Sequence, residues 1–416
     1  MERLKGSCII GQSGGPTSVI NASAQGCIEA ALGSDAIDKV YGAAYGITGV
    51  LDDRLYDIGL EDPAELARLM YTPSAIFGSC RYRLADPMTD DTDCQRLLDV
   101  FQKYNVRYFF YIGGNDSMDT CSKISAFLSQ NSYECRVMGI PKTIDNDLAL
   151  TDHCPGYGSA AKYVAHTCME VVLDARVYGA GSVTVLEVMG RNAGWLTAAS
   201  ALAKARGLGP DLIYLPEVPF DLADFIADVS RVHDRQRDVM VAVSEGIRDK
   251  NGTYISSYFS DTSKDRDAFG HARMGGLAGS LANFANAKIK AKVRGIELSL
   301  LQRCAAHMAS RTDIDEAYMA GKAAFEAAEQ GFTDKMLAFE RGPGPEYSCR
   351  TALVDLVDVA NQEKKIPREW INAAGNGLLE PFVEYAAPLI QGETGLECCA
   401  GLPRFANLRR IMTREV

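Results

Sequence analysis

Residues 107 to 117 read Arg107-Tyr-Phe-Phe-Tyr-Ile-Gly113-Gly114-Asn115-Asp116-Ser117, an apolar run that ends in two glycines and a group of polar side chains. The run is too apolar for one of its faces to lie in water, so it predicts a central strand of a parallel sheet that is covered on both sides. Similar runs cover residues 7–10, 136–140, 182–188 and 240–243. Ligands bind beyond the carboxyl ends of the strands in such sheets, so the polar turns after these runs are the expected active site.

Helical patterns follow most of these turns. They cover residues 18–32, 117–128 and 158–172, and longer patterns cover residues 275–292 and 314–330. The repeated order of strand, turn and helix predicts an α/β fold with mainly parallel sheets between layers of helices. The chain has 416 residues, and single hydrophobic cores stop growing at about 250–300 residues, so we expect two domains.

The composition argues against several kinds of partner. Lys and Arg number 43 against 54 Asp and Glu, a net charge of −11, so we expect no nucleic-acid partner. No apolar run approaches transmembrane length, and the N-terminus lacks the apolar region of a secretory signal. The twelve cysteines show neither the short repeated spacing of a zinc site nor that of a disulfide framework. We therefore expect a cytoplasmic protein with reduced thiols and no membrane partner.

Two of the polar turns predict a phosphate cradle. Gly14 and Gly15 follow the first apolar run and precede a helix, whose N-terminus offers free N–H groups to an anion. Asn115, Asp116 and Ser117 repeat the arrangement and add a carboxylate, which beside a phosphate requires a divalent cation such as Mg²⁺. Each turn also has a structural interpretation: a plain glycine turn in the first, and a helix cap at Asp116 in the second.

Other turns carry the charges that phosphoryl transfer needs. Pro141-Lys142-Thr143-Ile144-Asp145-Asn146-Asp147 places a lysine, suited to a phosphoryl group, beside aspartates that could take a proton from an attacking hydroxyl. The alternative is a solvated charged turn. Met189-Gly190-Arg191 and Ser244-Glu245-Gly246 add groups suited to a sugar phosphate and to sugar hydroxyls, although either could be a surface ion-pair partner.

Together these turns resemble those of the phosphofructokinase family, most closely its pyrophosphate-dependent branch. The resemblance is carried by residues 13–21, 78–81, 113–117, 141–147, 189–191, 244–246 and 294–303. It implies two Rossmann-like three-layer lobes. It also implies reversible transfer of a phosphoryl group from pyrophosphate to O1 of fructose 6-phosphate, giving fructose 1,6-bisphosphate and orthophosphate in glycolysis or gluconeogenesis. Mg²⁺ and a homo-oligomer, a dimer or larger, are implied as well.

The resemblance also implies a role for each site residue. Asp145 would take the proton from the 1-hydroxyl, and Arg81 and Lys142 would act on the transferring phosphoryl group. The donor would lie on Gly14, Gly15, Asn115, Asp116, Ser117 and Lys142, with Asn115 and Asp116 at the metal. Fructose 6-phosphate would contact Thr143, Asp145, Asp147, Met189, Gly190, Arg191, Glu245, Arg294 and Arg303. A partner subunit would supply some of the residues that bind the 6-phosphate.

In such an arrangement the donor lobe would comprise residues 1–158 with 302–350, and the sugar lobe residues 159–301. Residues 351–416 would form a C-terminal extension packed on the lobes. The segment Gly270-His271-Ala-Arg-Met-Gly-Gly resembles a loop of the family but lies too early in the chain, so we assign His271 no catalytic role.

The donor is expected to be pyrophosphate rather than ATP. Relatives that use ATP usually have glycine where this chain has Asp116 and Lys142. A carboxylate at the first position repels an α-phosphate, and an ammonium group at the second replaces charge compensation around the longer triphosphate. Asn115 stands where the family usually has an aspartate at the metal, so the cation would depend on Asp116, water and the donor.

Three other functions stay open from the sequence. The first is an ATP-dependent phosphofructokinase, and the second is a non-catalytic subunit that binds sugar phosphate. A kinase of the NAD or lipid class would also use a Gly-Gly-Asp turn, but it would lack the turns at residues 141–147 and 189–191, so the sequence disfavours it. No motif distinguishes fructose 6-phosphate from sedoheptulose 7-phosphate.

Overall fold

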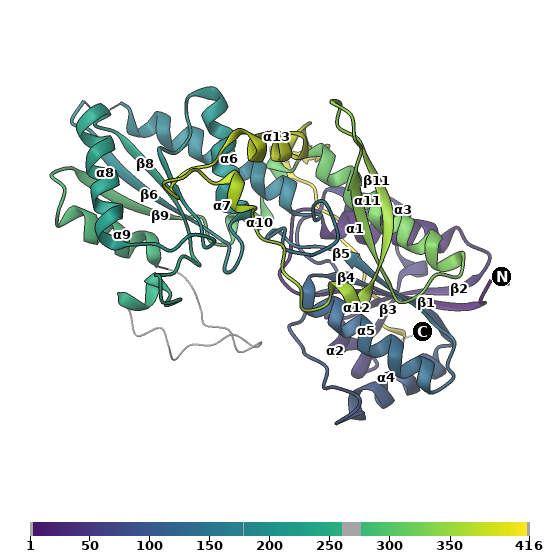
Figure 1. Cartoon of the computed structure of the whole chain (residues 1–416). Coiled ribbons are helices and arrows are strands. Elements are labelled where there is room, and N and C mark those ends of the chain that lie inside the picture. The colour runs from purple at the N-terminus through teal and green to yellow at the C-terminus, as the bar shows by residue number, and fades with distance from the viewer. Residues whose placement is uncertain (1–2, 178, 260–275, 414–416) are drawn as a thin grey trace.

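The computed structural model describes residues 3–177, 179–259 and 276–413. Figure 1 shows two groups of strands side by side, each covered by helices. One sheet has seven strands in the order β11-β10-β5-β4-β1-β2-β3, and the other has four in the order β7-β8-β6-β9. Most neighbouring strands are parallel, so the predicted α/β fold with two mainly parallel sheets is confirmed.

The strands of the first sheet are β1 (Gly6–Gln12), β2 (Ile37–Ala43), β3 (Leu55–Asp57), β4 (Val106–Gly113), β5 (Arg136–Pro141), β10 (Lys335–Arg341) and β11 (Cys349–Asp355). The five inner strands are parallel, and the edge strands β3 and β11 are antiparallel to their neighbours. The register pairs Gln12 with Ile112 and Gly113 with Pro141. The turns after β1, β4 and β5 therefore emerge at one edge of the sheet.

Helices cover both faces of this sheet. They are α1 (Ile20–Leu32), α2 (Ile47–Leu51), η1 (Ile58–Leu60), α3 (Pro63–Ala67), η2 (Arg68–Tyr71), α4 (Thr92–Lys103), α5 (Asn115–Gln130), α11 (Arg311–Glu329) and α12 (Leu356–Val359). Side chains alternate along each strand, so Ile10 and Phe110 pack with α1 and α11, while Ile9 and Phe109 pack with α4 and α5. The sheet is the middle layer of three.

The second sheet is fully parallel and is built from β6 (Ser182–Val188), β7 (Leu212–Tyr214), β8 (Val239–Ser244) and β9 (Lys292–Glu297). Its helices are α6 (Tyr157–Ala175), α7 (Trp195–Ala198), η3 (Ala199–Arg206), α8 (Leu222–Gln236), η4 (Ile255–Tyr258), α9 (Leu277–Asn286), α10 (Leu301–Cys304) and η6 (Ala306–Met308). Leu186 and Ala242 pack with α6 and η3, whereas Val185 and Val241 pack with α8 and α9. Val188 pairs with Ser244, so the turns after β6 and β8 also emerge together.

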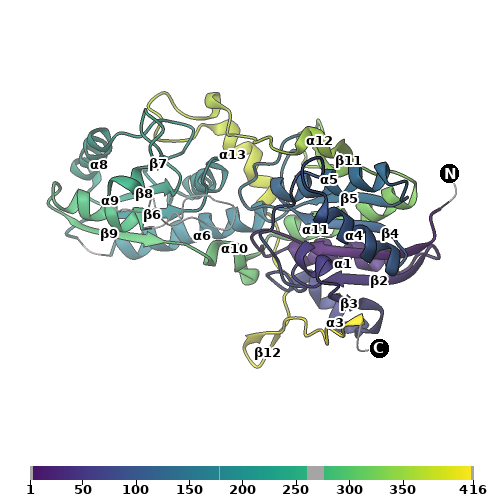
Figure 2. The same cartoon turned by 90° about the horizontal axis from the view of Figure 1, so that it is seen from below.

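The C-terminal part contains η7 (Arg368–Trp370), α13 (Glu380–Ala386), η8 (Ala387–Ile390), β12 (Cys398–Cys399) and β13 (Leu402–Pro403). Trp370 packs edge-on against Trp195 of the second lobe, with 6.1 Å between ring centroids. The last described residues return to the first lobe, where the N–H of Asp57 donates to the carbonyl of Ile411 at 2.9 Å. In Figure 2 the β12–β13 hairpin projects below both lobes.

One predicted helix boundary differs from the structure. The helix expected to continue to residue 292 ends at Asn286, and Lys292 already begins β9. The lobe boundary expected at residue 158 falls inside α6, and the one expected at residue 350 falls inside β11.

All twelve cysteines lie among the described residues and are free thiols. Among those residues, no helix is both long and apolar enough to cross a membrane.

Candidate active site

The turn after β1 is held to the segment that carries Arg81. Ser13 and Cys80 form a parallel bridge, the N–H of Gly14 donates to the carbonyl of Cys80 at 3.1 Å, and the Ser79 hydroxyl donates to the carbonyl of Gly14 at 2.7 Å. Gly14 has φ of 74°, a left-handed conformation that favours glycine. This pairing explains why a segment distant in sequence reaches the edge of the sheet.

Lys142 joins the three turns of the first lobe. Its N–H donates to the carbonyl of Gly113 at 3.0 Å, and its Nζ donates to the carbonyl of Gly15 at 2.7 Å. The side chain is only 3% exposed. Burial lowers the pKa of Lys142 to about 8, although Asp145 opposes the shift, and the nearby Arg81 and Arg303 lower the pKa further. An anion bound here would stabilise the charged form.

Arg303 completes a cluster of three cations. A Cβ placed on Gly15 would lie 3.1 Å from Nη1 of Arg303, so the guanidinium group lies against the donor turn. Burial lowers the pKa of Arg303, and the charge of Arg81 lowers it further. The adjacent Gln302 accepts a hydrogen bond from the N–H of Met189 at 3.2 Å, which ties α10 to the turn after β6. Lys142, Arg81 and Arg303 thus repel one another around the two glycines.

The two aspartates of the turn after β5 lie beside these cations. The N–H of Asp145 donates to Oγ1 of Thr143 at 3.1 Å, and Asn146, with φ of 54°, is held by Tyr385 and by the N–H of Cys154. Burial raises the pKa of Asp145 against the opposing charges of Lys142 and Arg191. Burial and the charge of Asp145 raise the pKa of Asp147 to about 7. The carboxylate of Asp145, from the first lobe, therefore lies near Arg191 of the second lobe.

The turns of the second lobe are packed closely against each other. Ser244 donates its hydroxyl to the carbonyl of Gly190, and the N–H of Gly190 donates to Oε1 of Glu245 at 3.4 Å. A Cβ on Gly246 would lie 1.9 Å from the carbonyl oxygen of Arg191, so only glycine fits there. Burial, followed by the charge of Asp145, raises the pKa of Glu245 to about 7. Asp145 thus interacts with both of the predicted sugar-binding turns.

Arg294 is the predicted site residue that lies apart from this cluster. It lies in the middle of β9, opposite Thr184 of β6. Its Nη1 atom is 3.4 Å from Oδ2 of Asp174, in the last turn of α6. The structure therefore separates Arg294 from Arg303, although both were predicted to hold the same phosphate.

The turn after β4 offers one carboxylate for a metal. Gly114 is the N-cap of α5, and Asp116 lies in the first turn without capping the helix, so the helix-cap interpretation of Asp116 was wrong. The carboxylate is exposed beside the free N–H groups of the helix. Asn115 instead bonds residues 361 and 362, through its Oδ1 atom to an N–H and through its Nδ2 atom to a carbonyl. Asp116 suits Mg²⁺, which usually takes one or two carboxylates, several waters and substrate phosphates.

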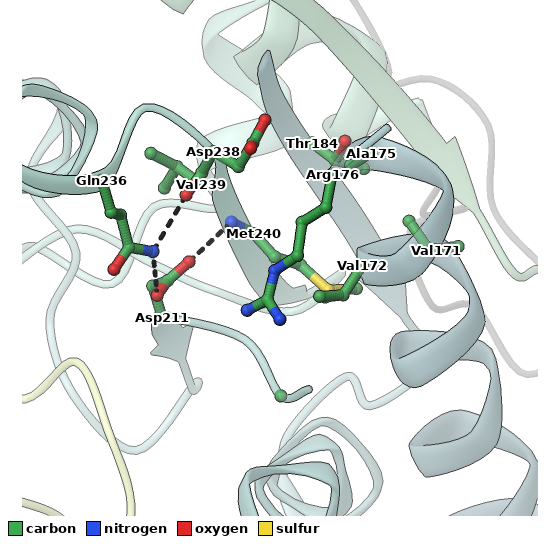
Figure 3. A pocket seen from close by; sticks show the side chains of 11 residues that line it. Val171, Val172, Ala175, Arg176, Thr184, Asp211, Gln236, Asp238, Val239 and Met240 are labelled. Atoms are coloured by element: carbon green, nitrogen blue, oxygen red, sulfur yellow. Dashed lines mark hydrogen bonds between the residues drawn. The ribbon is translucent and has the colours of Figure 1, made fainter. Parts of the chain in front are cut away.

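Two other features of the described residues do not provide a substrate site. A cavity of about 20 Å³ lies at the amino ends of β6 and β8 (Figure 3), at the opposite ends of these strands from the turns above. It has room for about one water, and Asp211 beside it accepts hydrogen bonds from Gln236 and Met240. His153, Glu316 and Cys349 also come together, but the His153 ring already bonds Asp152 at 2.9 Å and Glu316 at 2.7 Å.

Sequence reasoning missed several supporting residues. Gln302 directly precedes Arg303 in the quoted 294–303 segment, so its position was a usable signal. Ser79 lies in the 78–81 segment and was passed over for Arg81. Asn192 donates a hydrogen bond to Glu363 at 2.7 Å, and no sequence motif pointed to Glu363. His271, assigned no catalytic role, lies outside the described residues.

The two facing lobes, the cation cluster at the glycine turns and the partly buried carboxylate between them define a phosphotransferase site. The family model for phosphofructokinase matches residues 7–298. The chain belongs to the phosphofructokinase family, as its resemblance predicted.

Individual relatives are similar over nearly the whole chain. A protein named pyrophosphate–fructose 6-phosphate 1-phosphotransferase from Halomonas elongata is 43% identical over 96% of this chain and 95% of its own. A protein of the same name from Methylococcus capsulatus is 42% identical over 96% and 95%. The crystal structure of a pyrophosphate-dependent phosphofructokinase from Nitrosospira multiformis is 38% identical, with a TM-score of 0.88 over 98% of both chains.

Proposed function

We propose that this chain transfers a phosphoryl group reversibly from pyrophosphate to O1 of fructose 6-phosphate, giving fructose 1,6-bisphosphate and orthophosphate. The observation that carries the proposal is the cluster of Lys142, Arg81 and Arg303 against the glycine turn, with the partly buried Asp145 beside it. Such a cluster suits a small, highly charged anion. The names of the relatives support the same donor and sugar.

In the proposed mechanism the first lobe holds the donor. Gly14, Gly15 and the N-terminus of α5 would receive the phosphates, and Lys142 would neutralise them. When bound, Mg²⁺ would offset further negative charge on the donor, and Asp116 would be its protein ligand. The ionised carboxylate of Asp145 would accept the proton of the 1-hydroxyl as that oxygen attacks the phosphorus. Arg81 would stabilise the charge of the transferring group.

The second lobe would hold the sugar. Met189, Gly190 and Arg191 would contact fructose 6-phosphate from one turn, and Glu245 would accept hydrogen bonds from its hydroxyls. Thr143 and Asp147 would border the sugar from the catalytic turn, and Arg303 would contact phosphate where the two subsites meet. The lobes in this proposal comprise residues 1–158 with 302–350 for the donor and 159–301 for the sugar.

A coupled assay with fructose 6-phosphate and Mg²⁺ tests the donor. We expect turnover with pyrophosphate and none above background with ATP, because Asp116 repels the α-phosphate of a nucleotide. Turnover with ATP alone would contradict the donor assignment but keep Asp145 as the base. Binding of fructose 6-phosphate without turnover of either donor would favour the non-catalytic subunit.

We also propose that the active enzyme is a homo-oligomer in the cytoplasm. Arg294 lies 3.4 Å from Asp174 and away from the cluster of its own chain, which supports a role in a neighbouring site. Mixing two inactive variants, R294A and D145N, tests this proposal. If the partner subunit's Arg294 acts on each site, co-refolded mixtures regain up to about one quarter of the activity, from sites that receive both intact residues. No recovery in a sample shown to contain mixed oligomers would contradict the sharing.

A further inference from the structure

Residues 361–364, which we call the strap, connect the two lobes across the active site. The strap follows α12 in the first lobe and leads towards η7, and Figure 1 shows this part of the chain, in yellow-green, passing between the lobes. At its start the N–H of Asn361 and the carbonyl of Gln362 bond both atoms of the Asn115 amide. At its end the indole N–H of Trp195 donates to the carbonyl of Lys364 at 2.9 Å. The strap is therefore fixed to the donor turn and to the sugar lobe.

The end of the strap also lies along the catalytic turn. The N–H of Lys364 donates to the carbonyl of Asp147 at 2.7 Å. The Nζ atom of Lys364 donates to the carbonyls of Thr151 at 3.0 Å and Asp152 at 2.7 Å. Together with the bonds of residues 361 and 362 to Asn115, these contacts hold the main chain of the strap on both sides of Glu363.

Glu363 reaches from this fixed main chain to the sugar turn. Its Oε1 atom accepts a hydrogen bond from Nδ2 of Asn192 at 2.7 Å. The Oδ1 atom of Asn192 accepts from Nη2 of Arg248 at 2.8 Å, and the Arg248 guanidinium group lies over the ring of Tyr254, 4.2 Å from its centroid. The Asn192 amide is thus held at both ends. Since Asn192 directly follows Arg191, its orientation restricts the main chain that presents the arginine.

We propose that Glu363 is a positioning residue of the sugar site. It holds Asn192, and through Asn192 it holds Arg191, in the geometry that binds the phosphorylated sugar. The bonds between the strap and Asn115 fix the main chain from which Glu363 extends. The inference rests on the sugar-binding role proposed above for Arg191. The matched family model ends at residue 298, before the strap.

Two substitutions at the same position test the proposal. Glu363→Ala removes the acceptor and should raise KM for fructose 6-phosphate about 5- to 10-fold, as expected for one hydrogen bond at an exposed carboxylate. KM for pyrophosphate should change less than about twofold and kcat less than about threefold. Glu363→Gln keeps an acceptor oxygen without the charge and should restore KM for the sugar to within about twofold. Glu369→Ala, at an exposed glutamate just beyond the strap, is the matched control and should behave like the wild type.

A double-mutant cycle tests the route through Asn192. The double variant E363A/N192A should have the same KM for the sugar as N192A alone. N192A already removes the Glu363–Asn192 hydrogen bond, so losing the Glu363 carboxylate as well has no further effect. Additive effects would overturn the proposal. So would an unchanged KM for the sugar in E363A, a parallel rise of both KM values, or a failure of E363Q to restore KM.

An Arg191→Ala variant distinguishes a failure of the positioning role of Glu363 from a failure of the proposed sugar-binding role of Arg191. If R191A raises KM for fructose 6-phosphate while E363A does not, the positioning role is wrong and the proposed sugar site stands. If R191A leaves KM unchanged, the proposed role of Arg191 is wrong, and the positioning route fails with it. Glu363 is exposed, so all of its variants should fold, and thermal unfolding checks this directly.

Discussion

Replacing Lys142 with methionine should separate the role of its charge from its role in packing. Methionine has a similar length and no charge, so it fills the space but cannot neutralise a phosphate. Two unit charges about 4 Å apart interact by about 4 kcal/mol at an effective dielectric constant of about 20. Since about 1.4 kcal/mol corresponds to a factor of ten, kcat/KM for pyrophosphate should fall about 10²- to 10³-fold. Steady-state kinetics with varied pyrophosphate measures this directly.

The same variant should keep its stability. Burial lowers the pKa of Lys142 to about 8, which shows that the folded protein disfavours the buried ammonium ion. Removing the charge offsets the loss of the 2.7 Å hydrogen bond to Gly15. The free energy of unfolding should therefore change by less than about 2 kcal/mol. Urea unfolding of K142M beside the wild type provides the comparison.

The pH profile supplies an independent readout. The ammonium form binds phosphate, so kcat/KM for pyrophosphate in the wild type should fall as the pH rises through the lowered pKa of Lys142, about 8. That alkaline limb should be absent from the residual activity of K142M. A K142M variant that folds normally and keeps kcat/KM within about tenfold of the wild type would refute the assignment of Lys142 to the donor.

Three further outcomes follow from the site and its surroundings. Asp145→Asn should lower kcat by about 10²- to 10⁴-fold with little change in KM, because it removes only the base; near-normal turnover would show that another group takes the proton. Asp116→Gly should raise the Mg²⁺ concentration needed for half-maximal activity and increase the rate with ATP relative to pyrophosphate, which a donor assay at varied Mg²⁺ measures. Burial alone would lower the pKa of His153, but hydrogen bonds to Asp152 and Glu316 raise it. The stability that His153 contributes is therefore complete below its pKa in the unfolded chain. It is lost as the pH rises through the pKa of His153 in the folded protein. H153Q should lose about 1–3 kcal/mol of unfolding free energy at pH 6 and clearly less at pH 9, and equal losses at both would contradict the charged pair.

The central strands could be predicted because burial on both faces makes them continuous apolar runs. β1, β4, β5, β6 and β8 all lie where such runs were found. β9 was not predicted, and its first residue, Lys292, was placed in a helix, because it is an edge strand with exposed and half-exposed side chains, including Arg294 and Glu297. Its place in the sheet comes from main-chain pairing with β6, which leaves no apolar pattern to read.

The predicted turns supplied the charged residues of the site, and the structure supplied their contacts. The Lys-Thr-Ile-Asp-Asn-Asp turn could be singled out because a lysine and two aspartates follow a buried strand. The contact of Arg303 with Gly15 depends on the packing of α10 and could not be read from local sequence. The strap was missed for a similar reason. Its residues are polar and mostly exposed, and bonds between distant parts of the chain determine its position.

The insertion of the second lobe into the first sheet has a consequence for synthesis on the ribosome. The outer edge of β5 pairs with β10, whose first residue is Lys335, so the chain must extend by about 200 residues before that edge is covered. At about 5–20 residues per second, this takes roughly 10–40 s. During that interval the nascent chain exposes the unpaired N–H and C=O groups of an apolar strand, which are a template for pairing with other chains. The emerging polypeptide should therefore be most dependent on chaperones while the sugar lobe is being translated.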